Sequence, residues 1–396
     1  MTKSKPRILH VITRLDPGGS ATNTLVSADR LRKHGFDTFL AYGPTHDPDR
    51  AILHLLDKLK IEQFFIPHLV RNPSPLKDWL AMRQLRKIIK DGHFDLVYTH
   101  TSKAGVLGRR AARVCNTSSI HTPHGHIFYG YFGPILTWFF VYIERMMARH
   151  TERIISLTDI ETSESLANGI GIPGQYITIH SGVPLSSLMN IERAEGKKFR
   201  NKYGIPDSAF LFISIGRLEP IKGFDILIKA FAKARYSQQP VYLVIIGDGE
   251  ERNRLKTIAS EFPTGEKIKF AGALTDIRPA LSAANTFVLA SRNEGMGRVF
   301  IEAMAAGLPA IGTSVGGVPS LMSNGKNGIL VPGEDIDSLS AAMEKAAVDT
   351  TRMKEMGRNA AASVYPEYDE STMVQQIADL YRKVLQKHQH IGRSAR

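Results

Sequence analysis

The most informative segment of this chain is Ser291-Arg-Asn-Glu-Gly-Met-Gly-Arg-Val-Phe-Ile-Glu-Ala-Met-Ala-Ala-Gly307. It follows the apolar run Thr286–Ala290, which predicts a buried parallel strand. Its second half is rich in Ala and Met and predicts a helix, so the glycines of Glu294–Gly297 fall in the turn between them. Free backbone N–H groups and the helix dipole make such a turn an anion site.

Two carboxylates flank this turn, Glu294 within it and Glu302 eight residues later. A carboxylate repels a phosphate, so we expect these two side chains to bind hydroxyl groups, and sugar hydroxyls are the obvious candidates. The alternative is an ordinary strand–turn–helix segment with two solvated glutamates. This segment alone leaves both interpretations open.

Composition limits the class of protein. The 396 residues suit two domains of about 150–200 residues. Lys and Arg number 51 against 38 Asp and Glu, a net charge of +13 that suits nucleic acid, anionic lipid or phosphorylated small molecules. The basic residues are scattered and no nucleic-acid module is recognisable, so we expect no nucleic acid partner.

Two further features bear on localisation. The single cysteine, Cys115, argues against a disulfide framework, and the apolar run Ile8–Ile12 is too short for a signal peptide. The sequence therefore predicts a cytoplasmic protein.

Short apolar runs alternate with helical patterns along the whole chain. In the first half, strands are expected at 7–13, 38–42, 63–66, 96–99, 118–121, 153–157 and 176–180, with helices at 21–34, 76–90 and 103–114. In the second half, strands are expected at 210–216, 241–249, 286–290, 309–312 and 327–332, with helices at 276–284 and 371–386. This alternation predicts βαβ units with parallel sheets. We expect a solvent-exposed connection at 190–202, a loop at 270–274, and a disordered tail from Lys387.

Two motifs of the second half resemble those of glycosyltransferase family 4. The pattern Glu-Gly-x-Gly-(x)4-Glu-Ala-Met-Ala-x-Gly-x-Pro beginning at Glu294 resembles its donor-binding signature, and Gly216-Arg-Leu-Glu-Pro-Ile-Lys-Gly223 resembles its diphosphate motif. The resemblance spans nearly the whole chain and implies a retaining enzyme with the GT-B fold, two Rossmann-like parallel-sheet domains facing each other across a cleft. It implies an acceptor domain over 1–185, a donor domain over 186–368, a helix over 369–388 that crosses back to the first domain, and a basic tail over 389–396.

The resemblance also assigns roles in the donor domain. Glu302 is expected to bind the ribose, and Glu294 to bind the donor sugar as a catalytic residue. The donor diphosphate is expected to meet two cationic side chains and four backbone amides, from Arg217, Lys222, Gly295, Met296, Gly297 and Arg298.

In the first domain the same resemblance points to a glycine turn and a histidine. Gly18 and Gly19 are expected to close over the acceptor and the donor phosphate. In His121-Thr-Pro-His-Gly-His126, the motif implies His124 as the catalytic histidine, with His126 as the second choice. Three histidines with no carboxylate or cysteine nearby make a poor metal site, and the pairs Asp47-Pro-Asp49 and Asp335-Ile-Asp337 lie in polar turns. We therefore expect no metal and no cofactor.

The segment Tyr98–Arg109 resembles family members that act on bacterial surface polysaccharides. The expected activity is metal-independent transfer of a sugar from a UDP- or GDP-sugar to a lipid-linked or oligosaccharide acceptor, in the synthesis of capsule, exopolysaccharide or lipopolysaccharide. Two alternatives stay open: a sugar-nucleotide epimerase of the same fold, and a catalytically silent partner of a polysaccharide assembly complex.

Residues 127–148 are unusually aromatic and too short to span a membrane. One interpretation is a helix that enters the interface of an anionic membrane beside a lipid-linked acceptor, with the protein peripheral on the inner face of the cytoplasmic membrane. The other is a packed interdomain helix. The sequence favours neither.

Overall fold

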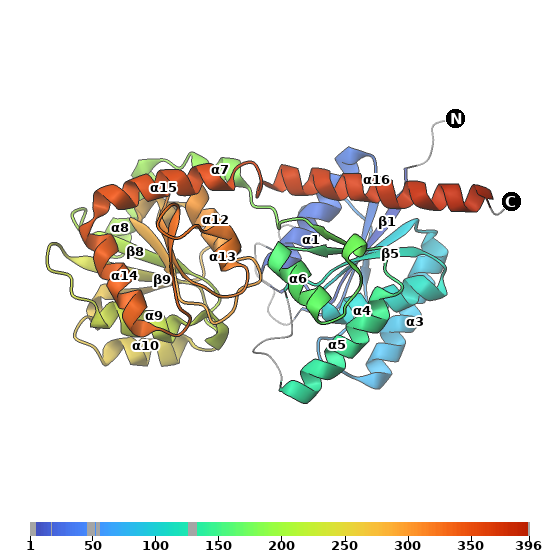
Figure 1. Ribbon diagram of the computed structural model, residues 1–396, viewed down its shortest axis with the longest axis horizontal. Coiled ribbons are helices and arrows are strands. Elements are labelled where there is room, and N and C mark those ends of the chain that lie inside the picture. The colour runs from blue at the N-terminus through green and yellow to red at the C-terminus, as the bar shows by residue number, and fades with distance from the viewer. Residues whose placement is uncertain (1–4, 17, 46–51, 53–55, 126–132, 395–396) are drawn as a thin grey trace. The chain divides into compact units, whose positions relative to one another are not determined.

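The computed structural model describes residues 5–16, 18–45, 52, 56–125 and 133–394 and divides into two compact units (Figure 1). Unit 1 comprises Met1–Gly182 and Glu370–Arg396, and unit 2 comprises Val183–Asp369. The chain therefore leaves unit 1 at Gly182 and returns to it at Glu370.

Unit 1 is built on a parallel seven-stranded sheet in the order β3-β2-β1-β4-β5-β6-β7. Its strands are β1 (Arg7–Ile12), β2 (Asp37–Tyr42), β3 (Gln63–Phe65), β4 (Leu96–His100), β5 (Ser118–Thr122), β6 (Arg153–Ser156) and β7 (Tyr176–Thr178). All seven expected strands are confirmed. The chain builds β2 and β3 on one side of β1 and then starts again with β4 on the other, so the strand order reverses between β1 and β4.

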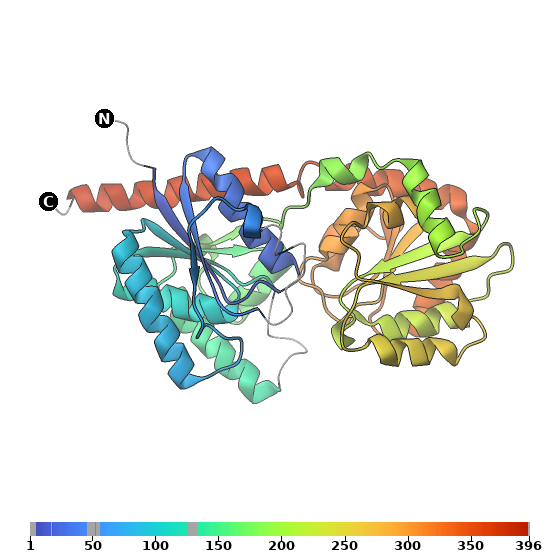
Figure 2. The same ribbon diagram turned by 180° about the vertical axis from the view of Figure 1, so that it is seen from behind.

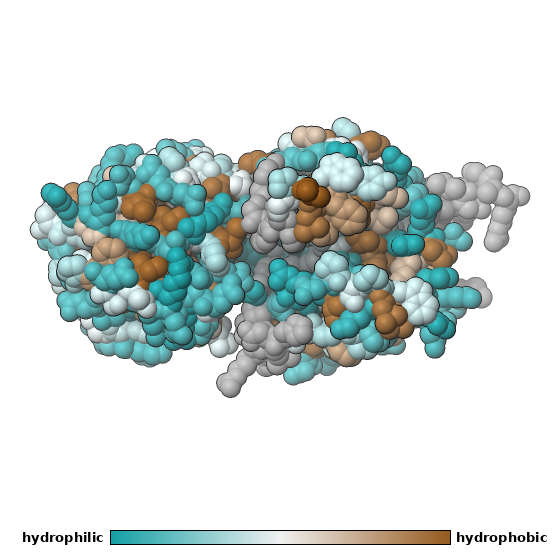
Figure 3. Space-filling model, turned by 90° about the horizontal axis from the view of Figure 1, so that it is seen from below, coloured by the Kyte–Doolittle hydropathy of each residue, from teal (hydrophilic) through white to brown (hydrophobic). Residues whose placement is uncertain are grey.

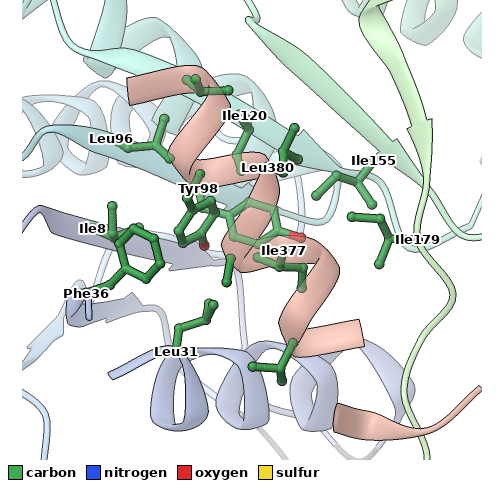
Figure 4. Close-up of a cluster of buried hydrophobic side chains, with 14 of the residues drawn as sticks. Ile8, Leu31, Phe36, Leu96, Tyr98, Ile120, Ile155, Ile179, Ile377 and Leu380 are labelled. Atoms are coloured by element: carbon green, nitrogen blue, oxygen red, sulfur yellow. The ribbon is translucent and has the colours of Figure 1, made fainter. Parts of the chain in front are cut away.

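Helices cover both faces of this sheet. They are α1 (Gly19–Arg30), α3 (Pro75–Gly92), α4 (Ser102–Val114), α5 (Pro134–Ala148), α6 (Asp159–Ala167) and α16 (Glu370–Ser394), with short 3-10 turns at Leu31–His34 and Pro173–Gln175. Successive strand residues point to opposite faces. Ile8 thus packs in the cluster that contains residues of α16, whereas Leu9 packs with residues of α3 and α4. Figures 1 and 2 show α16 along one side of unit 1 and α3 on the other, and Figure 4 shows the cluster beneath α16.

Unit 2 carries a parallel six-stranded sheet in the order β10-β9-β8-β11-β12-β13. Its strands are β8 (Phe210–Ile215), β9 (Val241–Ile246), β10 (Ile268–Gly272), β11 (Thr286–Leu289), β12 (Ala310–Thr313) and β13 (Gly328–Val331). Its helices are α7 (Leu185–Met189), α8 (Arg193–Lys202), α9 (Phe224–Lys233), α10 (Arg252–Ser260), α11 (Arg278–Ala283), α12 (Arg298–Ala305), α13 (Val318–Leu321), α14 (Ile336–Val348) and α15 (Thr350–Val364), with 3-10 turns at Pro220–Lys222 and Gly265–Lys267. Here the strand order reverses between β8 and β11.

Three expectations were wrong. Residues 193–202 form helix α8, because Phe199 is buried and the buried Arg200 donates hydrogen bonds to backbone carbonyls that include those of Ala283 and Ala209. The first three residues of the expected loop at 270–274 extend strand β10, which pairs with β9. Finally, α16 continues to Ser394, since no proline interrupts this stretch, so the expectation of disorder from Lys387 fails over 387–394.

Candidate active site

In unit 2, the expected donor residues gather at the carboxyl ends of β8 and β11. Arg217 and Lys222 follow β8, and Glu294 follows β11 at the start of the turn into α12. These strands are neighbours, and the strand order reverses between them. In open parallel α/β sheets this is where ligands bind, because the loops on the two sides diverge there.

Lys222 and Glu294 form an ion pair. Lys222 Nζ lies 2.6 Å from Glu294 Oε1, and Ser291 Oγ donates to the same oxygen at 2.8 Å. Only 8% of the Glu294 side chain is exposed, and a buried carboxylate requires such partners. The two side chains that the sequence assigns to diphosphate and sugar therefore meet at one point. Ser291, at the start of the segment, was not assigned a role.

A second set of contacts joins the loop after β8 to the loop after β11. Arg292 N–H donates to the Ile221 carbonyl at 2.8 Å, and its guanidinium forms an ion pair with Asp225 at 2.9 Å. Burial by itself would raise the pKa of Asp225, but the hydrogen bonds from Arg292 lower it overall. Gly223 has φ +63°, and a Cβ there would lie 1.9 Å from the Ala290 carbonyl oxygen, so the approach requires glycine. Sequence reasoning missed Arg292 and Asp225, since a charged pair 67 residues apart leaves no local pattern.

The turn before α12 is held by the loop after β12. Gly317 N–H donates to the Glu294 carbonyl at 2.9 Å, and a Cβ on Gly316 would lie 2.0 Å from that oxygen. Gly297 is the N-cap of α12 and has φ +76°, a conformation that favours glycine. The side chain of Met296 is buried at 3% exposure, so its backbone is the part able to bind a ligand.

The other two expected donor side chains have different partners. Arg217 Nη1 lies 2.7 Å from Glu219 Oε1, and both side chains are about a third exposed, at 36% and 35%. Glu302 lies on the second turn of α12 and is half-buried. Burial raises the pKa of Glu302, and Arg298, one helical turn earlier, lowers it in part.

In unit 1, the expected residues also follow strands on either side of the reversal point. Gly18 caps α1 after β1 with φ +152°, and among the described residues no atom lies within 4 Å of the position that a Cβ would take there. Gly19 is the first residue of α1. Thr13, directly after β1, contacts the segment that follows β4. Its hydroxyl oxygen lies 2.8 Å from that of Thr101 and accepts a hydrogen bond from Ala104 N–H at 3.0 Å. Sequence reasoning did not identify Thr13.

His124 lies in the turn after β5, with φ +61°. Its Nε2 lies 3.0 Å from Nδ1 of His100. The next residue, Gly125, donates its N–H to Glu161 at 3.3 Å, and burial raises the pKa of Glu161 to about 7. His126, the second choice, and residues 127–132 lie outside the described residues.

Three further histidines of unit 1 are buried: His10, His100 and His121. Burial lowers the pKa of His10 to about 3 and lowers the pKa values of the other two well below the ordinary range. Nearby positive or titratable groups, such as Arg109 beside His121, act in the same direction. These imidazoles are therefore neutral, and each carries one donor and one acceptor nitrogen.

Among the residues that the structure describes, no group of three or more His, Cys, Asp or Glu side chains has an arrangement that holds a metal ion. Asp335 caps α14 by accepting from Ser338 N–H at 2.9 Å, and Asp337 pairs with Lys233. The pair Asp47 and Asp49 lies outside the described residues.

Helix α5 exposes most of its large apolar side chains. Val141 and Ala148 pack against Ile154 and Ile170 of unit 1. Six others are more than two-fifths exposed: Ile135, Leu136, Trp138, Phe139, Tyr142 and Met146. Figure 3 shows hydrophobic side chains between hydrophilic ones on unit 1, on the side of α3, α4 and α5. In the described part of the chain, every helix is too short or too polar to cross a membrane.

Two family models match the chain: Glycosyltransferase Family 4 over residues 17–187 and Glycosyl transferases group 1 over 195–363. The UDP-Gal:alpha-D-GlcNAc-diphosphoundecaprenol alpha-1,3-galactosyltransferase of Escherichia coli is 30% identical over 389 residues, which cover 96% of this chain and 97% of that enzyme. The chain belongs to the family 4 glycosyltransferases. This confirms the prediction made from the two motifs of the second half.

Two more proteins extend this result. The putative glycosyltransferase EpsD of Bacillus subtilis (strain 168) is 28% identical, with 81% of this chain and 84% of EpsD covered. The crystal structure of Anabaena HepE in complex with UDP superimposes with a TM-score of 0.81 at 23% identity, covering 95% of this glycosyltransferase and all of HepE. The expected fold class, GT-B with two Rossmann-like parallel-sheet domains, is confirmed. Neither the epimerase nor the silent partner gains support from these relatives.

Proposed function

We propose that this glycosyltransferase moves a sugar from a UDP- or GDP-sugar, with retention of configuration, to a lipid-linked or oligosaccharide acceptor of cell-surface polysaccharide. The ion pair of Lys222 with Glu294 is the observation that carries the proposal. It lies at the carboxyl ends of β8 and β11, and Glu294 stands in the turn that leads into α12. The name of the E. coli relative supports the two substrate classes, since that enzyme uses UDP-Gal and a diphosphoundecaprenol-linked sugar.

The donor half of the reaction needs positive charge. The transition state resembles an oxocarbenium ion, while the nucleoside diphosphate leaves with growing negative charge. Lys222, Arg217 and the amides of Gly295–Arg298 at the start of α12 neutralise that charge. Two cationic side chains and a helix N-terminus supply what a divalent cation supplies elsewhere, so we propose a metal-independent reaction.

The two carboxylates bind hydroxyls of the donor. Glu294 accepts hydrogen bonds from the transferred sugar, and Glu302 accepts from the ribose. Without donor, Lys222 neutralises the buried charge of Glu294. With donor, Lys222 is shared with the diphosphate, while Ser291 keeps the carboxylate in place. In unit 1, the Gly18–Gly19 turn accommodates the acceptor, and His124 binds a hydroxyl of the reacting sugar.

We further propose that the enzyme is peripheral on an anionic membrane, on the cytoplasmic side. The exposed apolar side chains of α5 support this. Helices α3, α4 and α5 together contain ten Lys or Arg against three Asp or Glu, a net charge of +7 out of +13 for the chain. Arg109 is buried and paired with Glu144, and Lys103 is paired with Asp78, so these two pairs cancel within the helices. The other basic side chains attract anionic headgroups, and the aromatic side chains enter the interface.

A panel of sugar nucleotides tests the donor assignment. We expect one of them to raise the melting temperature and to release nucleoside diphosphate when a lipid-linked acceptor is added, with or without a chelator. Release from the donor alone, with epimerised sugar and no acceptor, identifies an epimerase instead. Loss of turnover on chelation contradicts the metal-independent reaction.

Substituting Glu294 separates binding from transfer. Glu294→Gln keeps the size of the side chain and an acceptor for Ser291, so the melting-temperature shift with donor is retained. We expect transfer to fall by about 100-fold or more, because the hydroxyl contacts strengthen in the transition state. A fully active Glu294→Gln enzyme contradicts this assignment.

A further inference from the structure

A line of four side chains in unit 1 leads from α16 to His124. The Tyr381 hydroxyl lies 3.4 Å from His10 Nε2, His10 Nδ1 lies 3.2 Å from His100 Nε2, and His100 Nδ1 lies 3.0 Å from His124 Nε2. The first three side chains are fully buried, and the rings of His10 and His100 stack with an interplanar angle of 8°. The line joins α16, β1, β4 and the turn after β5.

The hydrogen bonds along this line must all run in one direction. A neutral imidazole donates from one nitrogen and accepts at the other. If His10 donates from Nδ1 to His100, its Nε2 accepts from Tyr381, and His100 then donates from Nδ1 to His124. If His124 instead donates from Nε2, each bond reverses, and His10 donates from Nε2 to the hydroxyl oxygen of Tyr381.

The buried end of the line selects one of these directions. In the reversed arrangement the Tyr381 hydroxyl proton needs an acceptor other than His10, and within the described residues no other group hydrogen-bonds to this hydroxyl. Burying a donor without an acceptor is unfavourable. The neighbouring Tyr98 hydroxyl is already engaged with Thr122 at 2.7 Å and stays outside the line.

We propose that Tyr381, His10 and His100 are positioning residues that fix the tautomer of His124, with its proton on Nδ1. Tyr381 donates to His10, His10 to His100, and His100 to Nε2 of His124. The proton of the His124 ring is then on Nδ1, so a sugar hydroxyl that meets this nitrogen accepts a hydrogen bond from it. The role in transfer rests on the proposed function, whereas the tautomer is independent of it.

Ring nitrogen NMR of ¹⁵N-histidine-labelled protein tests the tautomer directly. The signals of His124 are those lost in His124→Gln. In the wild type we expect Nδ1 protonated and Nε2 unprotonated. Tyr381→Phe removes the donor and keeps the ring, so both tautomers of His124 become populated, whereas the matched control Tyr98→Phe leaves the signals unchanged. A proton on Nε2 in the wild type, or no response to Tyr381→Phe, overturns the proposal.

Kinetics then connect the tautomer to transfer. His100→Leu removes the donor to His124, and we expect kcat to fall about tenfold at unchanged donor KM. His100→Asn places an amide N–H near the former Nδ1, so kcat recovers. Equal losses in both variants overturn the positioning role. If His124→Gln itself retains full kcat, the sugar-binding role of His124 in the proposed function fails, while the NMR result still decides the tautomer.

Discussion

Units 1 and 2 both carry their candidate residues at the carboxyl ends of parallel strands, but the side chains around these residues differ in charge. Unit 2 uses ion pairs, such as Lys222 with Glu294. In unit 1 the neutral, buried imidazoles of His10 and His100 lead to His124. All 14 histidines of the chain lie outside 183–369. A departing diphosphate needs charge, whereas a hydroxyl needs only an oriented donor.

The largest expected effect is in unit 2. Lys222→Ala removes a cation from the departing diphosphate and leaves Glu294 unpaired, so kcat should fall about 100- to 1000-fold, or about 3–4 kcal/mol. The matched control is Lys229→Ala, an exposed lysine of α9. Steady-state rates of both variants measure the difference. If Lys222→Ala and Lys229→Ala have similar rates, the charge of Lys222 does not contribute to transfer, and the proposed difference between units 1 and 2 is wrong.

The next largest effect is on stability at low pH, which should differ between the two units. His10 has a folded-state pKa of about 3, below its unfolded value, so its contribution to stability is present above about pH 6.5 and is lost below it. From about pH 7 to about pH 5 this loss is about 2 kcal/mol for His10. His100 and His121 shift in the same direction. The pKa of Glu161 is raised to about 7, so protonation of Glu161 between about pH 7 and about pH 5 adds roughly 2 kcal/mol to the free energy of unfolding. This gain offsets the loss from one histidine.

Unit 1 should therefore lose stability on acidification, and unit 2, which lacks histidine, should not. Hydrogen exchange of β4 and β8 at both pH values, corrected for intrinsic rates, measures this. Glu161→Gln removes the offset, so the loss in unit 1 becomes larger. Equal acid responses of β4 and β8 would contradict the comparison.

The smallest effect concerns the surfaces. Of the 14 exposed large apolar side chains among the described residues, 11 belong to unit 1 and six to α5. Trp138→Ser with Phe139→Ser should weaken binding to vesicles of anionic phospholipid by at least about tenfold, since each aromatic side chain contributes about 1.5–3 kcal/mol when buried. The control is Val348→Ser, an exposed side chain of unit 2. Unchanged vesicle binding, or equal weakening by the control, would contradict the membrane surface on α5.

The two units also differ in how much their sequences reveal. In unit 2, each of the two motifs is continuous in sequence. The diphosphate motif lies in the loop after β8, and the donor-binding signature runs from the turn after β11 through α12. In unit 1, the line to His124 joins residues up to 371 apart. It depends on sheet register, which sets His100 beside Ile12, two residues along β1 from His10. No local pattern carries that information.

The errors in the predicted fold have the same origin. The charged composition of 190–202 predicts an exposed connection, but Phe199 and Arg200 are buried through contacts with residues such as Ala283, which are distant in sequence. The strands were predictable because their apolar runs are local. Side-chain pairing such as that of Arg292 with Asp225 required the folded chain.

Helix α16 has a consequence for synthesis on the ribosome. Seven buried side chains of the core beneath α16, from Met373 to Val384, belong to this helix, which is translated after the whole of unit 2. Unit 2 is thus complete in the nascent chain while the sheet of unit 1 still exposes the surface that α16 will cover. The sheet of unit 1 is synthesised first, but unit 1 can complete its core only after α16 has been made. Until then its exposed apolar face must be protected from association with other chains.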